Sequence, residues 1–335
     1  MSHSNSSLNC FANCMARYEH SYILHTPPCK PISPHLTFGV MAHDVLNRAG
    51  RLRDESADGV IEKGEYEQVI PSEVLYPDLK ETFSINNWHN YFNSIIKQTA
   101  KYEKELVDEI KNTNSGDVHI DRELKLQLTV RELVEIASIK NISQPLVGVI
   151  DLLIRTDNYA IIIDYKFSST KKTQDDFDMN SQLPLYAFLV HTIYKIPLRN
   201  IRYGYIDIPK QMFGMPTVLT NGTLSRSKSQ NVSQEMYEKA VIAVHGDDPV
   251  YNCKEGGYYY DCWCNLALNK PAYLSVQYLD MSTYNGVIND LFDAARMIDF
   301  MTQHKMPFLK KYDSYSCKDC EYINSCKSWL TVCGG

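Results

Sequence analysis

Residues 148–166 read GVIDLLIRTDNYAIIIDYK, and this stretch decides the fold. Two β-rich runs, 145–154 and 159–167, lie on either side of a short polar segment. That segment contains Asp157 and Asn158, residue types that favour tight turns. The pattern therefore predicts an antiparallel hairpin with an apolar second strand.

Charged side chains in this hairpin indicate metal-dependent chemistry. Alternate side chains share a strand face, so Asp164 and Lys166 point one way and Tyr165 the other, and the hairpin brings Asp151 beside Asp164. Converging carboxylates repel each other unless a divalent cation lies between them, and oxygen ligands suit Mg²⁺ or Mn²⁺. An adjacent ammonium can orient the attacking water. The residues predict phosphodiester hydrolysis; the alternative is two turn-flanking aspartates and a surface lysine.

The elements around the hairpin predict an α/β core. Apolar periodicity and alternation favour helices over 39–53, 87–111, 177–194 and 284–303, and strands over 118–129 and 201–208. We expect a mixed central sheet with flanking helices. Residues 211–270 show no clear period and are interpreted as an elaboration on that core.

Composition limits the functional classes. The chain has 335 residues, 44% of them apolar and 22% charged, which is typical of a globular protein and excludes wholesale disorder. A net charge of -6 argues against a protein that coats nucleic acid non-specifically. The N-terminus has no basic region followed by an apolar run, and the longest apolar runs are far shorter than the ~20 residues of a membrane helix. We expect a soluble, intracellular (cytoplasmic) protein without a membrane partner.

Four short motifs extend the hypothesis beyond the hairpin. In chain order they are Gly39-x-x-x-His43-x-x-Leu46, Gly148-x-x-Asp151, Asp164-Tyr165-Lys166 and Gln182-x-x-x-Tyr186. Together they resemble the RecB-like branch of the PD-(D/E)XK nuclease superfamily, in which such motifs occur in this order and at about this spacing. The resemblance implies a restriction-endonuclease-like core.

The resemblance also implies a role for each matched residue. The Mg²⁺ or Mn²⁺ ligands would be His43, Asp151, Asp164 and the carbonyl of Tyr165. Lys166 would be the catalytic lysine, with Gln182 and Tyr186 contacting DNA or positioning the site. Glu123 resembles an additional acidic residue that some members carry, although a single glutamate on an alternating strand is also typical of a solvated position.

The cysteines indicate a second metal centre. Three thiols lie within ten residues in Cys317-x-x-Cys320-x5-Cys326, a spacing that favours a soft metal with a fourth ligand elsewhere. Iron–sulfur members of the same branch, including AddB-type subunits and CRISPR-adaptation nucleases, carry one cysteine before the nuclease core and three after it. The resemblance implies a [4Fe–4S] cluster that joins the two chain ends, with Cys14 as the fourth ligand and Cys10 as the competing candidate. This chain has Met15 where the family usually has proline.

A looser group of cysteines lies in the elaboration. Cys253, Cys262 and Cys264 leave two interpretations open, a further metal site or buried small side chains.

These observations predict one nuclease domain over 1–335. Its parts would be an N-terminal segment with the histidine helix (1–53), a catalytic core (117–210), the elaboration (211–270) and a C-terminal helix with the cysteine cluster (284–335). By resemblance it would be a DNA exonuclease acting on single strands or ends, in repair, recombination or CRISPR-type processing, with a helicase, recombination or CRISPR-type protein as a partner. The alternatives are a non-catalytic iron–sulfur adaptor that binds DNA ends, and a zinc-stabilised interaction protein.

Overall fold

A five-stranded sheet forms the centre of the molecule. The computed structural model describes residues 2–30, 33–56, 68–71, 88–113, 116–136, 141–168, 173–210, 213–309, 317–318 and 320–326. The strands follow one another in chain order: β1 His119–Leu128, β2 Leu146–Arg155, β3 Ala160–Ser168, β4 Ile201–Pro209 and β5 Tyr273–Tyr278. β3 and β4 are parallel and the other neighbours are antiparallel. The expected mixed sheet and the hairpin between β2 and β3 are therefore confirmed.

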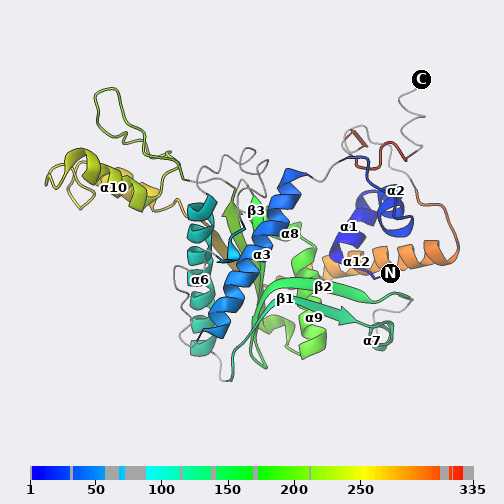
Figure 1. The fold of residues 1–335 in the computed structure, drawn as a ribbon. Helices are drawn as coiled ribbons and strands as arrows, with labels where there is room; N and C mark the ends of the chain where they lie inside the picture. Colours follow the sequence, from blue (N-terminus) through cyan, green and yellow to red (C-terminus); the bar gives the residue numbers. More distant parts are fainter. Residues whose placement is uncertain are drawn as a thin grey trace.

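Helices cover both faces of this sheet (Figure 1). One face packs against α3 (Pro34–Glu55) and α6 (Trp88–Thr113), and the other against α1 (Asn5–Asn13), α9 (Gln182–Tyr194) and α12 (Met281–Gln303). The isoleucine run of β3 is divided between the two cores: Ile161 and Ile163 face α3 and α6, and Ile162 faces α9. Burial on both faces explains why this strand is continuously apolar rather than alternating.

The helix expected over 177–194 is two helices, because the chain turns before Gln182. α8 spans Gln174–Asp178 and α9 begins at Gln182. The Asn180 side chain accepts hydrogen bonds from the backbone N–H groups of Gln182 and Leu183, at 2.8 and 2.9 Å. This satisfies donors that a helix start leaves without partners. The turn places Gln182 at the start of α9, beside the strand that carries Lys166.

Other elements lie outside the expected pattern. β5 was not predicted, and the shorter helices are α2 Met15–Tyr18, η1 Glu19–Ile23, α7 Val130–Glu135, η3 Leu198–Asn200, α10 Gln234–His245 and α11 Tyr260–Leu266. No helix in the described part of the chain has both the length and the apolar character needed to cross a membrane.

The insertion between β4 and β5, residues 213–270, has an apolar core of its own. This core includes Tyr237 and Val241 of α10 and Tyr259 just before α11, each at most 1% exposed. In Figure 1, α10 lies well away from the sheet. Cys253 and Cys262 are buried in this small core, which agrees with their interpretation as small packed side chains, and Cys264 is exposed.

The two ends of the described chain lie side by side. Arg17 pairs with Glu321 at 2.8 Å, and the Ser21 hydroxyl donates to the Tyr322 hydroxyl at 3.0 Å. The N-terminal segment is also fixed to α12, because buried His3 contacts the Asp299 carboxylate at 3.0 Å. These contacts bring together segments about 300 residues apart in the sequence.

Candidate active site

Three elements bring nitrogen and carboxylate ligands to one point. His43 lies on α3, Glu123 on β1 and Asp151 on β2, and one ligand atom from each lies within 4.8 Å of the others. The distance from His43 Nδ1 is 3.5 Å to Asp151 Oδ2 and 3.9 Å to Glu123 Oε1. Imidazole and carboxylate donors fit Mn²⁺ well and Mg²⁺ through the oxygens.

A reversal in the strands explains how the two carboxylates meet. Leu124 packs on the α9 side of the sheet, whereas Arg122 reaches Glu103 of α6 on the other side. Residues two apart on a regular strand share a face, but the side chains of β1 before and after Glu123 point to opposite faces of the sheet. The backbone at Glu123 is left-handed, with a φ of +47°. This left-handed backbone costs a non-glycine residue on the order of 1 kcal/mol or more.

β2 reverses at the matching position. Ile150 lies in the α9-side core and Leu152 in the α3 and α6 core, with Asp151 between them. Because Arg122 pairs with Leu152, and Leu124 with Ile150, the register sets Glu123 opposite Asp151. Both carboxylates therefore lie at the position where the alternation of side chains between the two sheet faces is reversed in β1 and β2.

Asp151 also replaces a backbone contact between β2 and β3. The ladder between these strands runs from the pair Arg155 and Ala160 to the pair Leu152 and Ile163. Beyond it, Asp151 Oδ2 accepts a hydrogen bond from the Tyr165 backbone N–H at 2.7 Å. Burial, and then the charge of Asp164, raise the pKa of Asp151 well above its usual value. A bound cation would relieve this unfavourable charge, so the donor set fits a divalent metal.

His43 is suited to act as a neutral ligand. Burial, and then the charge of Lys166, lower the pKa of His43 to about 4, while a hydrogen bond with the Tyr165 backbone acts in the opposite direction. The imidazole is therefore uncharged near pH 7, the form that binds metals.

The lysine lies in a chain of polar contacts. Lys166 Nζ is 2.6 Å from Asp164 Oδ2 and donates to Gln182 Oε1 at 3.0 Å. Gln182 in turn donates from Nε2 to the Tyr186 hydroxyl at 2.7 Å. The first turn of α9 thus holds the ammonium over the end of β3.

Gly148 allows α9 to approach this closely. A Cβ at this position would lie 2.7 Å from Leu189 Cδ1 and 3.0 Å from the Tyr186 ring. The glycine of the Gly148-x-x-Asp151 motif is therefore required where the Tyr186 ring crosses β2.

A cavity opens beside Lys166. Its volume is about 340 Å³, and it is lined by Lys166, Thr173, Asp175, Asp176, Met179, Asn180 and Tyr205. The Lys166 ammonium therefore borders accessible space, which is also lined by Asp175 and Asp176.

The structure brings residues from the four motifs to one end of the sheet, but the compact group of metal-binding side chains differs from the expected ligand set. Glu123, the additional acidic candidate, belongs to the compact group with His43 and Asp151. Asp164, expected to be a ligand, lies outside that group and contacts Lys166. Its charge still contributes to raising the pKa of both Asp151 and Glu123, so it lies close by.

The cysteines at the chain ends approach one another without forming a single-ion site. Burial raises the pKa of Cys320, and the charges of Glu321 and Cys14 add to this effect. Cys10 is affected by both thiols, and its pKa rises to about 11, mainly through burial. Among the described residues no three cysteine sulfurs lie within 4.8 Å of one another. The expected [4Fe–4S] cluster is not shown and stays a prediction, with Cys14 as its N-terminal ligand and Cys10 as the competing candidate.

Comparisons with known proteins give the family of the chain. The family model described as the PD-(D/E)XK nuclease superfamily matches residues 2–327. No curated protein matches the chain. Among solved structures, a provisionally named exonuclease from Eubacterium rectale matches with a TM-score of 0.44 and 9% identity, over 94% of this chain and 86% of that one. SSO0001 matches with a TM-score of 0.25 and 13% identity, over 86% of each chain. Likenesses this weak carry no argument about function.

Proposed function

Because the chain belongs to the PD-(D/E)XK nuclease superfamily, we propose that it is a Mg²⁺- or Mn²⁺-dependent deoxyribonuclease, an exonuclease acting on single strands or DNA ends. The observation that carries this proposal is the meeting of His43, Glu123 and Asp151 within 4.8 Å, beside the pair of Lys166 and Asp164. The preference for ends and single strands rests on family resemblance.

The metal would be held by His43, Glu123 and Asp151, with Asp164 and the Tyr165 carbonyl close by. A divalent ion there would neutralise phosphate charge and make a water molecule more acidic. The protein supplies the rest: a rigid donor set, an uncharged imidazole and a buried carboxylate whose negative charge a cation would balance.

Lys166 would position the attacking water. An ammonium has three N–H donors, and in the described structure two of them are directed at Asp164 and Gln182. The third remains for a water or a phosphate oxygen on the side of the cavity. The link from Gln182 to Tyr186 fixes the lysine, so we assign both residues a positioning role.

We further propose that the protein belongs to the iron–sulfur group of the RecB-like branch, with a [4Fe–4S] cluster on Cys14, Cys317, Cys320 and Cys326. The contacts between the chain ends support this, because they hold the segment that follows Cys14 beside the segment that follows Cys320. The cluster would be structural and would close the nuclease core inside one loop. The family match over 2–327 supports a single domain. By family resemblance we also propose repair, recombination or CRISPR-type processing as the setting, with a helicase, recombination or CRISPR-type protein as a partner.

Cleavage of end-labelled DNA tests the enzyme proposal. Anaerobically purified protein is incubated with Mn²⁺ and single- or double-stranded DNA, beside Asp164→Ala, Lys166→Ala and the control Lys125→Ala, which removes an exposed lysine of β1. We expect the parent and Lys125→Ala to cleave and the two site variants to lose at least about a hundredfold in rate. Equal cleavage by all four proteins would reject the assigned site.

The same assay separates two further alternatives. An exonuclease releases labelled mononucleotides or short fragments from ends and leaves a single-stranded circle intact, whereas an endonuclease opens the circle. If the parent binds DNA ends tightly but cleaves neither substrate, the adaptor alternative holds instead.

Iron and sulfide analysis tests the cluster. The parent should be brown when purified without oxygen, and Cys320→Ala should lose both iron and sulfide. Cys264→Ala, which removes an exposed cysteine of the insertion, is the control and should retain them. Unchanged content in Cys320→Ala would remove Cys320 from the ligand set, and bound zinc without iron would reject the cluster.

A further inference from the structure

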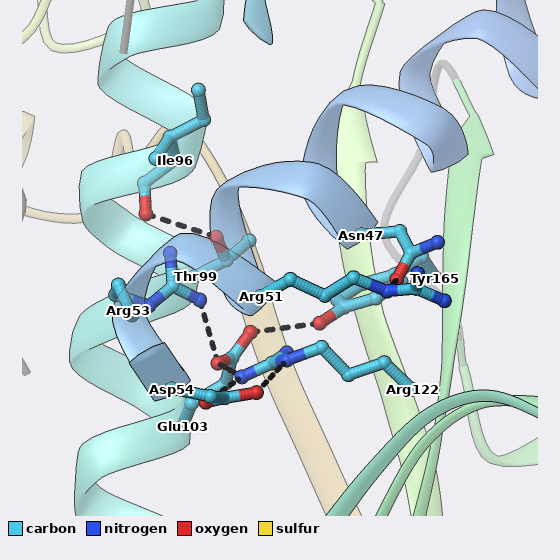
Figure 2. A network of polar contacts seen from close by, with 9 residues as sticks. All are labelled: Asn47, Arg51, Arg53, Asp54, Ile96, Thr99, Glu103, Arg122 and Tyr165. Atoms are coloured by element: carbon cyan, nitrogen blue, oxygen red, sulfur yellow. Dashed lines mark hydrogen bonds and ion pairs between the residues drawn. The ribbon is translucent and has the colours of Figure 1, made fainter. Parts of the chain in front are cut away.

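A buried ionic cluster lies behind the candidate site, on the side of α6 (Figure 2). Its centre is Glu103 of α6, which is 6% exposed. Glu103 Oε2 accepts hydrogen bonds from Arg53 at 2.6 Å and Arg122 at 2.8 Å, and Oε1 accepts one from the Tyr165 hydroxyl at 2.8 Å. Arg122 also donates to both carboxylate oxygens of Asp54, at 2.7 and 3.1 Å.

Each partner of Glu103 belongs to an element that carries a site residue. Arg122 directly precedes Glu123 on β1, and Tyr165 stands between Asp164 and Lys166 on β3. Arg53 lies on α3, the helix of His43. The Glu103 carboxylate therefore connects α3, β1 and β3, the three elements that carry the candidate site's histidine, glutamate and lysine.

Tyr165 links the cluster around Glu103 to the proposed metal ligands. Its hydroxyl is held by Glu103 on one face of the sheet, and its backbone N–H donates to Asp151 Oδ2 at 2.7 Å. The Tyr165 ring also lies edge-on to the His43 ring, with their centroids 6.1 Å apart. Because the ladder between β2 and β3 ends at Leu152 and Ile163, this part of β3 relies on side-chain contacts on that edge.

Stability alone does not account for such a cluster. Burying a carboxylate and two guanidinium groups carries a large desolvation penalty, and packed apolar side chains of similar volume often serve a core equally well or better. We propose that Glu103, through Arg122 and Tyr165, is a positioning residue that sets the spacing of the metal ligands. This inference rests on the proposed metal site and adds Glu103, Arg122 and the Tyr165 side chain to it.

The test compares two variants that each lose one buried hydroxyl. Tyr165→Phe removes the hydroxyl that donates to Glu103 but leaves Glu103 paired with both arginines. Tyr102→Phe is the matched control: Tyr102 is the neighbouring residue on α6, is 7% exposed, and its hydroxyl donates to the Ala272 carbonyl at 3.0 Å, away from the catalytic strand. Both variants should fold, with similar small losses of melting temperature.

Binding of Mn²⁺ in the absence of DNA is measured by the electron paramagnetic resonance signal of the free ion. Tyr165→Phe should bind Mn²⁺ about tenfold more weakly than the parent, and Tyr102→Phe should match the parent. In cleavage assays, Tyr165→Phe should lose kcat with an unchanged KM for DNA, and added Mn²⁺ should recover part of the rate. Glu103→Gln should weaken Mn²⁺ binding at least as much as Tyr165→Phe.

The outcomes separate this inference from the proposed function. If Tyr165→Phe binds Mn²⁺ like the parent, or if both tyrosine variants weaken binding equally, the positioning role is wrong. If the parent itself binds no Mn²⁺, or Asp151→Asn binds it as well as the parent does, the metal site is wrong and the positioning role falls with it.

Discussion

The candidate active site and the junction of the chain ends are organised differently. In the candidate active site, the backbone positions the carboxylates: strand register sets Glu123 opposite Asp151, and the Tyr165 backbone N–H donates to the Asp151 carboxylate. At the junction, side chains on short segments make most of the contacts, for example Arg17 with Glu321, whose side chains are 48% and 28% exposed. One backbone hydrogen bond, from the Cys29 N–H to the Glu321 carbonyl at 2.8 Å, adds to them. A site built on paired strands is preformed, whereas a junction of exposed side chains is weak unless another bond reinforces it.

Removal of the proposed cluster at the junction should cause the largest loss of stability. A crosslink that closes a loop from Cys14 to Cys317 stabilises the fold by on the order of 5 kcal/mol in the chain-entropy description. We expect Cys14→Ala to lower the free energy of unfolding by about that amount, as measured by anaerobic denaturation, with Cys264→Ala as the control. A parallel test of Cys10→Ala decides between the two cysteines, because the true ligand should show the loss.

Asp151→Asn should break the active site and leave the junction intact. The amide cannot supply the negative charge that a divalent ion requires, so we expect a loss of about a thousandfold in single-turnover cleavage, or about 4 kcal/mol in the barrier. Asp121→Asn, which removes a carboxylate paired with Arg155 on the same pair of strands, should keep most of the activity. Iron content should be unchanged in both variants, and a parallel loss of iron would show that the two regions are coupled.

The contact between His3 and Asp299 should give an intermediate effect that depends on pH. Burial tends to raise the pKa of Asp299, but hydrogen bonds from His3 and the Ser143 backbone outweigh it and lower the pKa below its usual value. A lowered pKa stabilises the fold above about pH 4, and this contribution is lost as the pH falls through the folded-state value.

We therefore expect Asp299→Asn to lose about 2 kcal/mol of stability at pH 7 and to show a shallower loss below pH 4 than the parent. Asp293→Asn, on the exposed side of α12, should follow the parent at every pH. Chemical denaturation over a pH series measures both variants, and identical acid profiles for Asp299→Asn and the parent would contradict the assignment.

Arg17→Ala should give the smallest effect. Its ion pair with Glu321 is partly exposed, and pairs of this kind contribute less than about 1 kcal/mol. Thermal unfolding in low and high salt should show a small loss that salt abolishes. A loss of several kcal/mol would mean that side chains alone hold the junction, which would weaken the case for a metal there.

The sequence predicted those parts of the site that depend on local patterns. The hairpin follows from two apolar runs around Asp157 and Asn158, and the shared face of Asp164 and Lys166 follows from strand alternation. The grouping of Gln182 with Tyr186 follows from their helical spacing. The match of the family model confirms the superfamily assignment that these motifs suggested.

The reversal at Glu123 could not be predicted in this way. The run from Ile120 to Leu128 alternates except at Arg122, and glutamate has no particular preference for a left-handed backbone. The cluster around Glu103 was also missed, because its members come from four separate elements and no spacing along the chain connects them. Signals were available for two other misses: Asn180 is a residue that favours helix starts, and Tyr273–Tyr278 alternates as a strand should.

The insertion between β4 and β5 has a consequence for how this fold can vary. The ladder pairs Asp207 with Tyr273, so the segments that enter and leave the insertion start from adjacent positions on neighbouring antiparallel strands. A short hairpin could join such strands directly, and the insertion carries its own apolar core. We therefore expect the sheet and the candidate active site to tolerate exchange of the whole insertion.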